Sequence, residues 1–168
     1  MGGMTMKPIR ANLWFDTQAE DAARFYISVF KDSKMGSITH SPEAGQEITN
    51  LPPGSVLTVT FELNGQPFLA LNGGPAFTFS EAISFELPCT DQAELDYYWD
   101  RLSEGGDPAA QNCGWLKDKF GVSWQVVPEN WEAMATDPDQ AKVERVMAAM
   151  FEMKKLDFAA LQRAFDGT

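Results

Sequence analysis

Two stretches of this chain repeat the same pattern 74 positions apart, and this repeat restricts the possible folds more than any other feature. An apolar strand-like run beginning at Leu13 leads to a helix start at Thr17–Glu20, and a second run beginning at Leu87 leads to another at Asp91–Glu94. Each helix start has a capping-box pattern, in which a side-chain oxygen accepts from a free helix amide and a carboxylate three residues later reaches back to the cap. The repeat predicts two similar units with a cleft between them.

Strand and helix patterns follow one another in the order that such a repeat requires. The strand patterns fall at 9–15, 34–40, 56–63, 66–72, 81–88, 111–116 and 122–127, and the helix patterns at 17–30 and 91–102. From residue 128 the chain becomes helical, with predicted starts at Asp137-Pro138 and Asp157. The first helix of this tail carries an apolar stripe for packing, formed by Val143, Val146, Met147, Met150 and Met153.

The Asn64-Gly65 dipeptide marks the clearest local structure, because it favours a two-residue hairpin turn. Pairing across this turn places Phe61 opposite Phe68 and Val59 opposite Ala70. Both faces of the hairpin carry apolar residues, so we expect one face to pack on a helix and the other to line an enclosed space. We assign the face of Phe61, Phe68 and Ala70 to the enclosed space, with the two Phe side chains filling core.

Charge and composition exclude several classes of function. The chain has 168 residues, a net charge of −11 and 44% hydrophobic residues, so we expect a folded domain that repels nucleic acid and anionic membranes. The apolar runs are too short to cross a bilayer, and residues 1–4 carry no signal-peptide pattern, which predicts a cytoplasmic protein. Cys89 and Cys113 are too few for a disulfide framework, so buried, unreactive thiols are expected.

Several separated motifs together resemble one known family. They are residues 12–16, 20–26, 68–75, 82–85 and 113–128. In this order they resemble the PhnB-like branch of the vicinal oxygen chelate (glyoxalase/bleomycin-resistance) superfamily, whose members are often labelled 3-demethylubiquinone-9 3-methyltransferase. The resemblance extends over residues 7–165. It implies an α+β fold of paired βαβββ modules with a C-terminal helical tail, and a homodimer. We place module one at about 7–75, module two at about 76–130 and the tail at about 131–165.

The family label raises the question of methyl transfer. A methyltransferase usually holds S-adenosylmethionine at a glycine-rich turn between a strand and a helix, and this chain has no G-x-G-x-G. Gly73-Gly74-Pro75 follows a strand, but no helix pattern begins there. The label is therefore an expected name and not an activity read from the residues.

Enzymes of the superfamily commonly hold a divalent metal through His, Gln and Glu side chains on inward strand faces. The resemblance puts these positions near Ala11 or Asn12, at Ala70, at Ser84 and at Gln125. Of these, only Gln125, and weakly Asn12, could bind a metal. His40, the only histidine, lies outside the set. We therefore expect neither a metal site nor a cofactor.

The remaining inward positions suggest a cup for a small aromatic or apolar metabolite, with polar groups to orient it. The ligand-contacting residues that we predict are Asn12, Trp14, Asn72, Ser84, Glu86, Trp115 and Gln125. Glu86 is a candidate for acid–base chemistry if it is enclosed among aromatic side chains, and a solvated carboxylate at the rim if it is not. Lys117-Asp118-Lys119 reads as a charged turn.

Three functions remain open from the sequence. The protein could bind a small molecule without metal, it could be an enzyme (a metal-dependent lyase or dioxygenase, or a methyltransferase), or it could be a dimeric scaffold whose tail carries the interaction. Few of the inward positions carry a side chain that could bind a metal. We therefore favour the first function, binding of a small molecule without metal.

Overall fold

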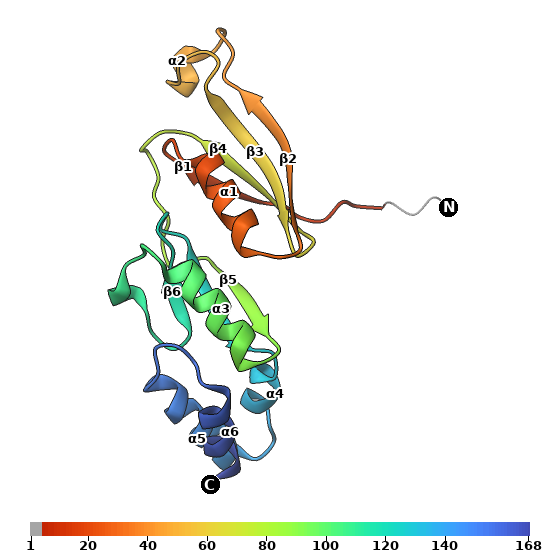
Figure 1. Cartoon of the computed structure of the whole chain (residues 1–168), viewed down its shortest axis with the longest axis vertical. Helices are drawn as coiled ribbons and strands as arrows, with labels where there is room; N and C mark the ends of the chain where they lie inside the picture. The colour runs from red at the N-terminus through yellow and green to blue at the C-terminus, as the bar shows by residue number, and fades with distance from the viewer. Residues whose placement is uncertain (1–4) are drawn as a thin grey trace. The chain divides into compact units, whose positions relative to one another are not determined.

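The computed structural model describes residues 5–168, so the expectation about a signal peptide at residues 1–4 lies outside the described residues. The chain forms two compact units, one ending at Thr78 and the other comprising Phe79–Thr168. Both combine a small sheet with helices, as the α+β prediction required (Figure 1). None of the helices in residues 5–168 has the length and hydropathy needed to cross a bilayer.

The first unit contains a four-stranded sheet in the order β1-β4-β3-β2. Its elements are β1 (Ala11–Phe15), α1 (Ala19–Val29), β2 (Ser33–His40), α2 (Gln46–Thr49), β3 (Val56–Leu63) and β4 (Gln66–Asn72). β1 pairs with β4 in parallel, whereas the other pairs are antiparallel. This is a βαβββ module with α1 packed on one face of the sheet (Figure 1).

The β3–β4 hairpin has the predicted turn and register. Asn64 and Gly65 both adopt positive φ angles, of 50° and 79°, as this two-residue turn requires. Phe61 pairs with Phe68 and Val59 with Ala70, as expected from the sequence.

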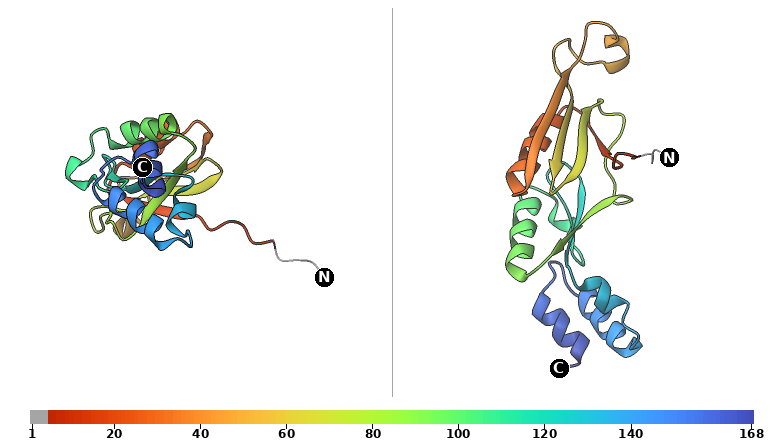
Figure 2. Two further views of the ribbon diagram at one scale, coloured as in Figure 1. Left: turned by 90° about the horizontal axis from the view of Figure 1, so that it is seen from below. Right: turned by 90° about the vertical axis from the view of Figure 1, so that its right-hand side faces the viewer.

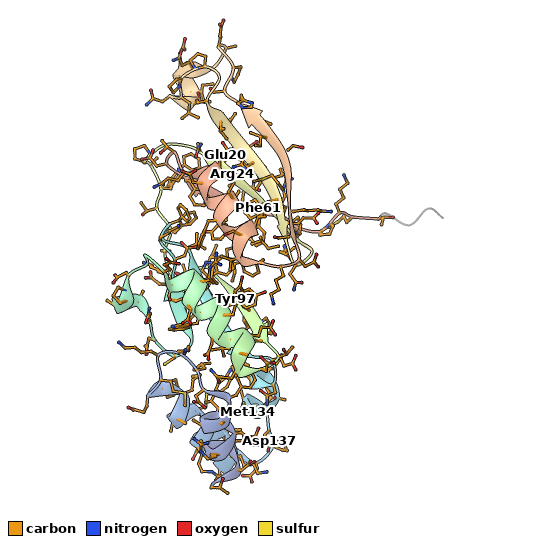
Figure 3. The ribbon with its side chains drawn as sticks, in the orientation of Figure 1. Glu20, Arg24, Phe61, Tyr97, Met134 and Asp137 are labelled. Carbon is orange, nitrogen blue, oxygen red and sulfur yellow. The ribbon has the colours of Figure 1, made fainter. Side chains whose placement is uncertain are left out.

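The core of the first unit lies between α1 and the sheet. Tyr26 is fully buried, and its ring stacks on Phe61 with centroids 6.1 Å apart, while Phe61 stacks on Phe68 at 5.3 Å. Figure 3 labels Phe61 of this core. It also labels Glu20 and Arg24, which form an ion pair of 2.7 Å on the exposed side of α1. The prediction that Phe61 and Phe68 fill core is therefore confirmed.

The second unit contains a three-stranded sheet in the order β5-β7-β6. Its elements are β5 (Ser84–Cys89), α3 (Gln92–Ser103), the 3₁₀ helix η1 (Pro108–Ala110), β6 (Trp115–Lys117) and β7 (Ser123–Pro128). β5 pairs with β7 in parallel and β6 with β7 antiparallel, so this unit repeats the first with one strand fewer. The apolar face of the sheet, which includes Trp124 and Val126, packs on the buried side of α3.

Of the two predicted capping boxes, only the Asp91 cap is formed as expected, because Glu94 reaches Thr90 and not the Asp91 amide. Asp91 accepts from the Glu94 amide (2.8 Å), and the Glu94 carboxylate accepts from the amide and hydroxyl of Thr90. The prediction for Thr17 was wrong: Gln18 occupies the N-cap of α1 and makes no capping bond with its side chain.

The turn after β6 is built around a buried carboxylate, so the prediction of a simple charged turn at residues 117–119 was wrong for Asp118. This side chain is only 2% exposed. It accepts from the Phe120 amide (2.8 Å), the Val122 amide (3.0 Å) and Trp124 Nε1 (2.9 Å). Asp118 therefore holds the turn closed and fixes the core tryptophan of β7.

Three helices follow β7: α4 (Trp131–Ala135), α5 (Gln140–Phe151) and α6 (Phe158–Asp166). α5 and α6 pack against each other (Figure 2). Asp157 caps α6 as predicted, but α5 is capped by Asp139 and not by Asp137, which accepts from the Asp139 amide instead. In the predicted stripe Val143 and Val146 are buried, and the three methionines are half-buried.

The segment 153–157 between α5 and α6, which we call the strap, binds to α3 and to the turn before β6 through its main-chain carbonyls. The carbonyls of Met153 and Lys154 accept from the amides of Cys113 and Gly114, both at 2.8 Å. The Leu156 carbonyl accepts from Gln92 Nε2 (3.2 Å). Cys113 and Gly114 both have positive φ, which turns their amides toward the strap.

Candidate functional site

The second sheet has a mixed face opposite α3, which we call the open face. It carries Ser84, Glu86 and Pro88 of β5, Trp115 and Lys117 of β6, and Ser123, Gln125 and Val127 of β7. Strand alternation explains this grouping, because directly paired residues share a face and every second residue of a strand points the same way. Four of the predicted contact residues, Ser84, Glu86, Trp115 and Gln125, thus lie on one face.

A hydrogen-bonded pair occupies the middle of this open face. Gln125 donates from Nε2 to the Ser84 hydroxyl at 2.9 Å. Next to Ser84, across the β5–β7 ladder, lies Ser123. Its side chain is buried, and its Oγ is the one buried side-chain polar atom in the described part of the chain that has no hydrogen-bond partner. An unsatisfied buried polar group costs about 1–3 kcal/mol of stability. The lack of a partner for this hydroxyl is therefore the feature of the face that most needs an explanation.

The open face also carries two charged groups, Lys117 and Glu86. Lys117 forms an ion pair with Glu81 (2.7 Å), and this hydrogen bond holds the pKa of Glu81 below its ordinary value. Glu86 is exposed. The hypothesis that aromatic side chains enclose Glu86 was therefore wrong, and the alternative of a solvated carboxylate is the one observed.

The open face of the first sheet carries Asn12, Trp14, Thr58, Thr60, Leu69 and Leu71. Asn12 is exposed, and Trp14 is half-buried. The indole of Trp14 donates to the Gly74 carbonyl (2.9 Å) and meets Phe77 edge-on with ring centroids 4.9 Å apart. A Cβ at Gly73 would collide with this indole, so the glycine is required for the ring to lie flat on the 73–74 turn.

The hairpin residues assigned to the enclosed space in the sequence face the other way, which corrects the prediction. Because Leu13 pairs with Ala70 and Phe15 with Asn72, the side chains of Phe61, Phe68, Ala70 and Asn72 point toward α1. Ala70 is fully buried there, so it is not the ligand position that the resemblance implied.

Asn72 has a structural position in place of the predicted ligand contact. It is 6% exposed, accepts from the Ala19 amide (2.8 Å) and donates to the Val56 carbonyl (3.0 Å). It thus satisfies a free amide at the start of α1. The sequence pattern had predicted Thr17 for this capping role. A cap supplied by a strand 53 residues away leaves no local signal in the sequence.

The side chains present do not fit the metal that the superfamily commonly holds. At the carried-over positions the open faces offer Asn12, Ser84 and Gln125, without a carboxylate or imidazole among them. Within residues 5–168 no three His, Cys, Asp or Glu side chains gather closely enough to hold an ion. Neutral oxygen donors of this kind bind transition metals weakly.

The two cysteines differ in burial. Cys89 is fully buried, and its burial, with Glu94 and Asp91 nearby, raises the pKa of its thiol to about 12. It is therefore protonated at neutral pH and unreactive, as expected. Cys113 is only partly buried, so the prediction of a buried thiol was wrong for this residue.

With a βαβββ module followed by a shortened copy, the protein has the vicinal oxygen chelate (glyoxalase) fold. Solved structures with low identity share it. They include protein PA1353 from Pseudomonas aeruginosa (20% identity, 74% of this chain and 98% of that chain, TM-score 0.57) and the fosfomycin resistance protein FosX from Listeria monocytogenes (12%, 80% and 100%, TM-score 0.50).

The family model for 3-demethylubiquinone-9 3-methyltransferase matches residues 7–127. A PhnB protein from Bacillus cereus, described with the same methyltransferase name, is 34% identical over 73% of this chain and 99% of that chain, with a TM-score of 0.61. The chain therefore belongs to this family. Among curated proteins none is a significant match.

The family model matches residues up to 127, so the match ends before the helical tail. α4, α5 and α6 all begin after residue 127. Any contribution of α4 to a site was thus missed in the sequence, where Trp131 and Glu132 follow the last strand without a recognisable motif.

Proposed function

We propose that the open face of the second sheet binds a small organic molecule in a site that uses no metal. The observation that carries this proposal is the buried, unpartnered hydroxyl of Ser123 beside the Gln125–Ser84 pair. A ligand oxygen or nitrogen at this place would satisfy Ser123 and the remaining hydrogen-bonding capacity of Gln125. Trp115, half-buried next to Gln125, adds an apolar surface for an aromatic ring.

The open face of the first sheet is a second proposed contact surface. Asn12 is free to hydrogen-bond, and Trp14 and Phe77 present aromatic surface that the Gly73–Gly74 turn holds in place. Asn72 is not part of this proposal, because both ends of its amide already have partners.

The family name and the superfamily suggest the competing activities. A methyltransferase has to bind S-adenosylmethionine, and a metal-dependent lyase or dioxygenase has to bind a divalent ion. Calorimetry with S-adenosylmethionine and elemental analysis of the purified protein separate these activities from metal-free binding. A stoichiometric transition metal would contradict the proposal, and its absence together with ligand binding would support it.

Two aromatic probes, menadione and 2-naphthol, are expected to quench the fluorescence of Trp115 without added metal. Replacing Gln125 with alanine should weaken binding about 10-fold, because it removes a polar contact of the site and releases Ser84. The matched control is Gln66→Ala, an exposed glutamine at the start of β4. If neither probe quenches or shifts the melting temperature, or if both variants behave alike, the assignment of the site to this face is wrong.

We also propose a homodimer, as the family resemblance implies. Large exposed apolar side chains, among them Ile83 and Phe151, are consistent with an interface (73% and 63% exposed). One chain has a mass of 18.6 kDa, and light scattering should give twice this value. A measured mass equal to that of one chain at micromolar concentration would contradict the proposal. Removing residues from Asp137 onward tests the tail: loss of the dimer would place the interface there, and a truncated dimer would exclude it.

A further inference from the structure

A hollow of about 400 Å³ lies where the open face of the second sheet meets α4. It is lined by Glu86, Pro88, Val127, Pro128, Glu129, Trp131, Glu132 and Ala135. The size suits a small organic ligand. Five of the lining residues are apolar, and the other three are glutamates, so the lining contains no cation.

The three carboxylates are available to a ligand. Glu86, Glu129 and Glu132 are exposed, and within the described part of the chain none of their side-chain oxygens has a hydrogen bond or ion pair. The half-buried indole of Trp131 lies among them in the same lining. Carboxylates around an aromatic ring attract an organic cation in two ways, by charge and by the negative face of the ring.

A second, independent observation also points to a ligand on this face. Ser123, Gln125 and Val127 alternate along β7 on the same side, and Val127 lines the hollow. The strand face that leads into the hollow therefore also carries the Ser123 hydroxyl, which is buried, has no hydrogen-bond partner and lies outside the lining of the hollow itself. The polar groups of this face form one strip, with Gln125 and Glu86 directly paired in its middle.

We infer that the ligand of this face is an amphipathic cation, an aromatic or aliphatic amine. This inference rests on the proposed function and names its ligand class. The ammonium group lies among Glu86, Glu129 and Glu132 against Trp131, and the body of the ligand extends along Gln125 toward Ser123. A neutral or anionic aromatic molecule of the same shape gains nothing from the carboxylates.

The hollow also gives the helical tail a role in specificity. Trp131, Glu132 and Ala135 belong to α4, and the family match ends at residue 127. One wall of the hollow is thus built from residues that lie beyond the part of the chain matched by the family model.

The test compares three probes that share a phenylethyl group and differ in charge: 2-phenylethylamine, 2-phenylethanol and 3-phenylpropionate. Isothermal titration calorimetry is expected to show the amine binding at least about 10-fold more tightly than the alcohol, with the carboxylate weakest. The preference should shrink as salt is raised, because the three glutamates are exposed.

Charge-neutralising variants identify the hollow as the source of the preference. The triple variant E86Q/E129Q/E132Q should lose the advantage of the amine and keep the affinity for the alcohol. A matched triple variant, E43Q/E47Q/E144Q, removes three exposed glutamates elsewhere and should retain the preference. Far-UV circular dichroism and the melting temperature verify that both variants are folded.

The outcomes separate the two proposals. If the alcohol binds as tightly as the amine and Gln125→Ala weakens both, the inference about charge is overturned and the proposed site stands. If the matched control loses the preference as fully as the hollow variant, net charge and not the hollow is responsible, and the inference is overturned. If none of the three probes binds, both proposals fail for this ligand size.

Discussion

Replacing Asp118 with alanine is expected to lower the free energy of unfolding by about 3 kcal/mol or more. The substitution leaves three donors without their acceptor: the amides of Phe120 and Val122 and the indole N–H of Trp124. Each is in or beside the core of the second unit, so water cannot replace the carboxylate without opening the turn. Urea unfolding followed by tryptophan fluorescence measures the loss.

Two further substitutions in this turn act as controls. Lys119→Ala removes an exposed neighbouring side chain, and its effect should stay within about 0.5 kcal/mol. Asp118→Asn should be intermediate, since its amide oxygen accepts while its NH₂ group faces a donor. An Asp118→Ala protein as stable as the wild type would show that the three bonds contribute nothing net.

Truncating Phe61 to alanine is expected to cost about 3–5 kcal/mol in the first unit. Phe61 is 2% exposed and stacks between Tyr26 of α1 and Phe68 of β4, so its removal leaves a cavity that the sheet cannot close. Thermal and urea unfolding of the purified variant give the value, with the far-UV spectrum verifying that the native state is populated.

The matched control for this substitution is Phe151→Ala. The same atoms are removed, but this side chain is 63% exposed, so the cost should be below about 1 kcal/mol. Phe61→Leu should fall between the two because it fills part of the cavity. Equal effects of Phe61→Ala and Phe151→Ala would mean that the stack contributes no more than an exposed ring.

Local signals in the sequence predicted local structure well. Asn64-Gly65 predicts a turn whose two positive φ angles few other residue pairs adopt easily, and the register of the hairpin follows from it. Asp91 and Asp157 cap the helices that they precede. The duplicated strand-to-helix pattern predicts two units because each copy specifies the same short-range geometry.

Structural features that depend on residues far apart in the chain could not be predicted from such local signals. Alternation shows that Phe61, Phe68 and Ala70 share a face of the hairpin, but not which face α1 covers, because both faces are apolar. The parallel register that pairs Leu13 with Ala70 decides this, and it joins residues 57 positions apart. The cap of α1 by Asn72 has the same non-local origin.

The candidate site was predictable where it depended on strand alternation alone. Ser84, Glu86 and Gln125 lie on one face because their spacing along paired strands requires it. The burial of Ser123 and Asp118 was not predictable, since neither a serine in a strand nor an aspartate between two lysines signals burial. Nor could the wall formed by α4 be foreseen, because it depends on how the tail folds back.

The strap has a consequence for how the tail can vary between related proteins. Its carbonyls at Met153, Lys154 and Leu156 accept the bonds that hold it, and every residue type, proline included, supplies a carbonyl. Substitutions along the strap should therefore be tolerated widely, except at Leu156, whose side chain is buried, and at Asp157, whose side chain caps α6. Inserting or deleting one residue would instead move each carbonyl out of reach of its donor. Among related proteins, the length of this segment is therefore expected to be conserved more strictly than its residue types.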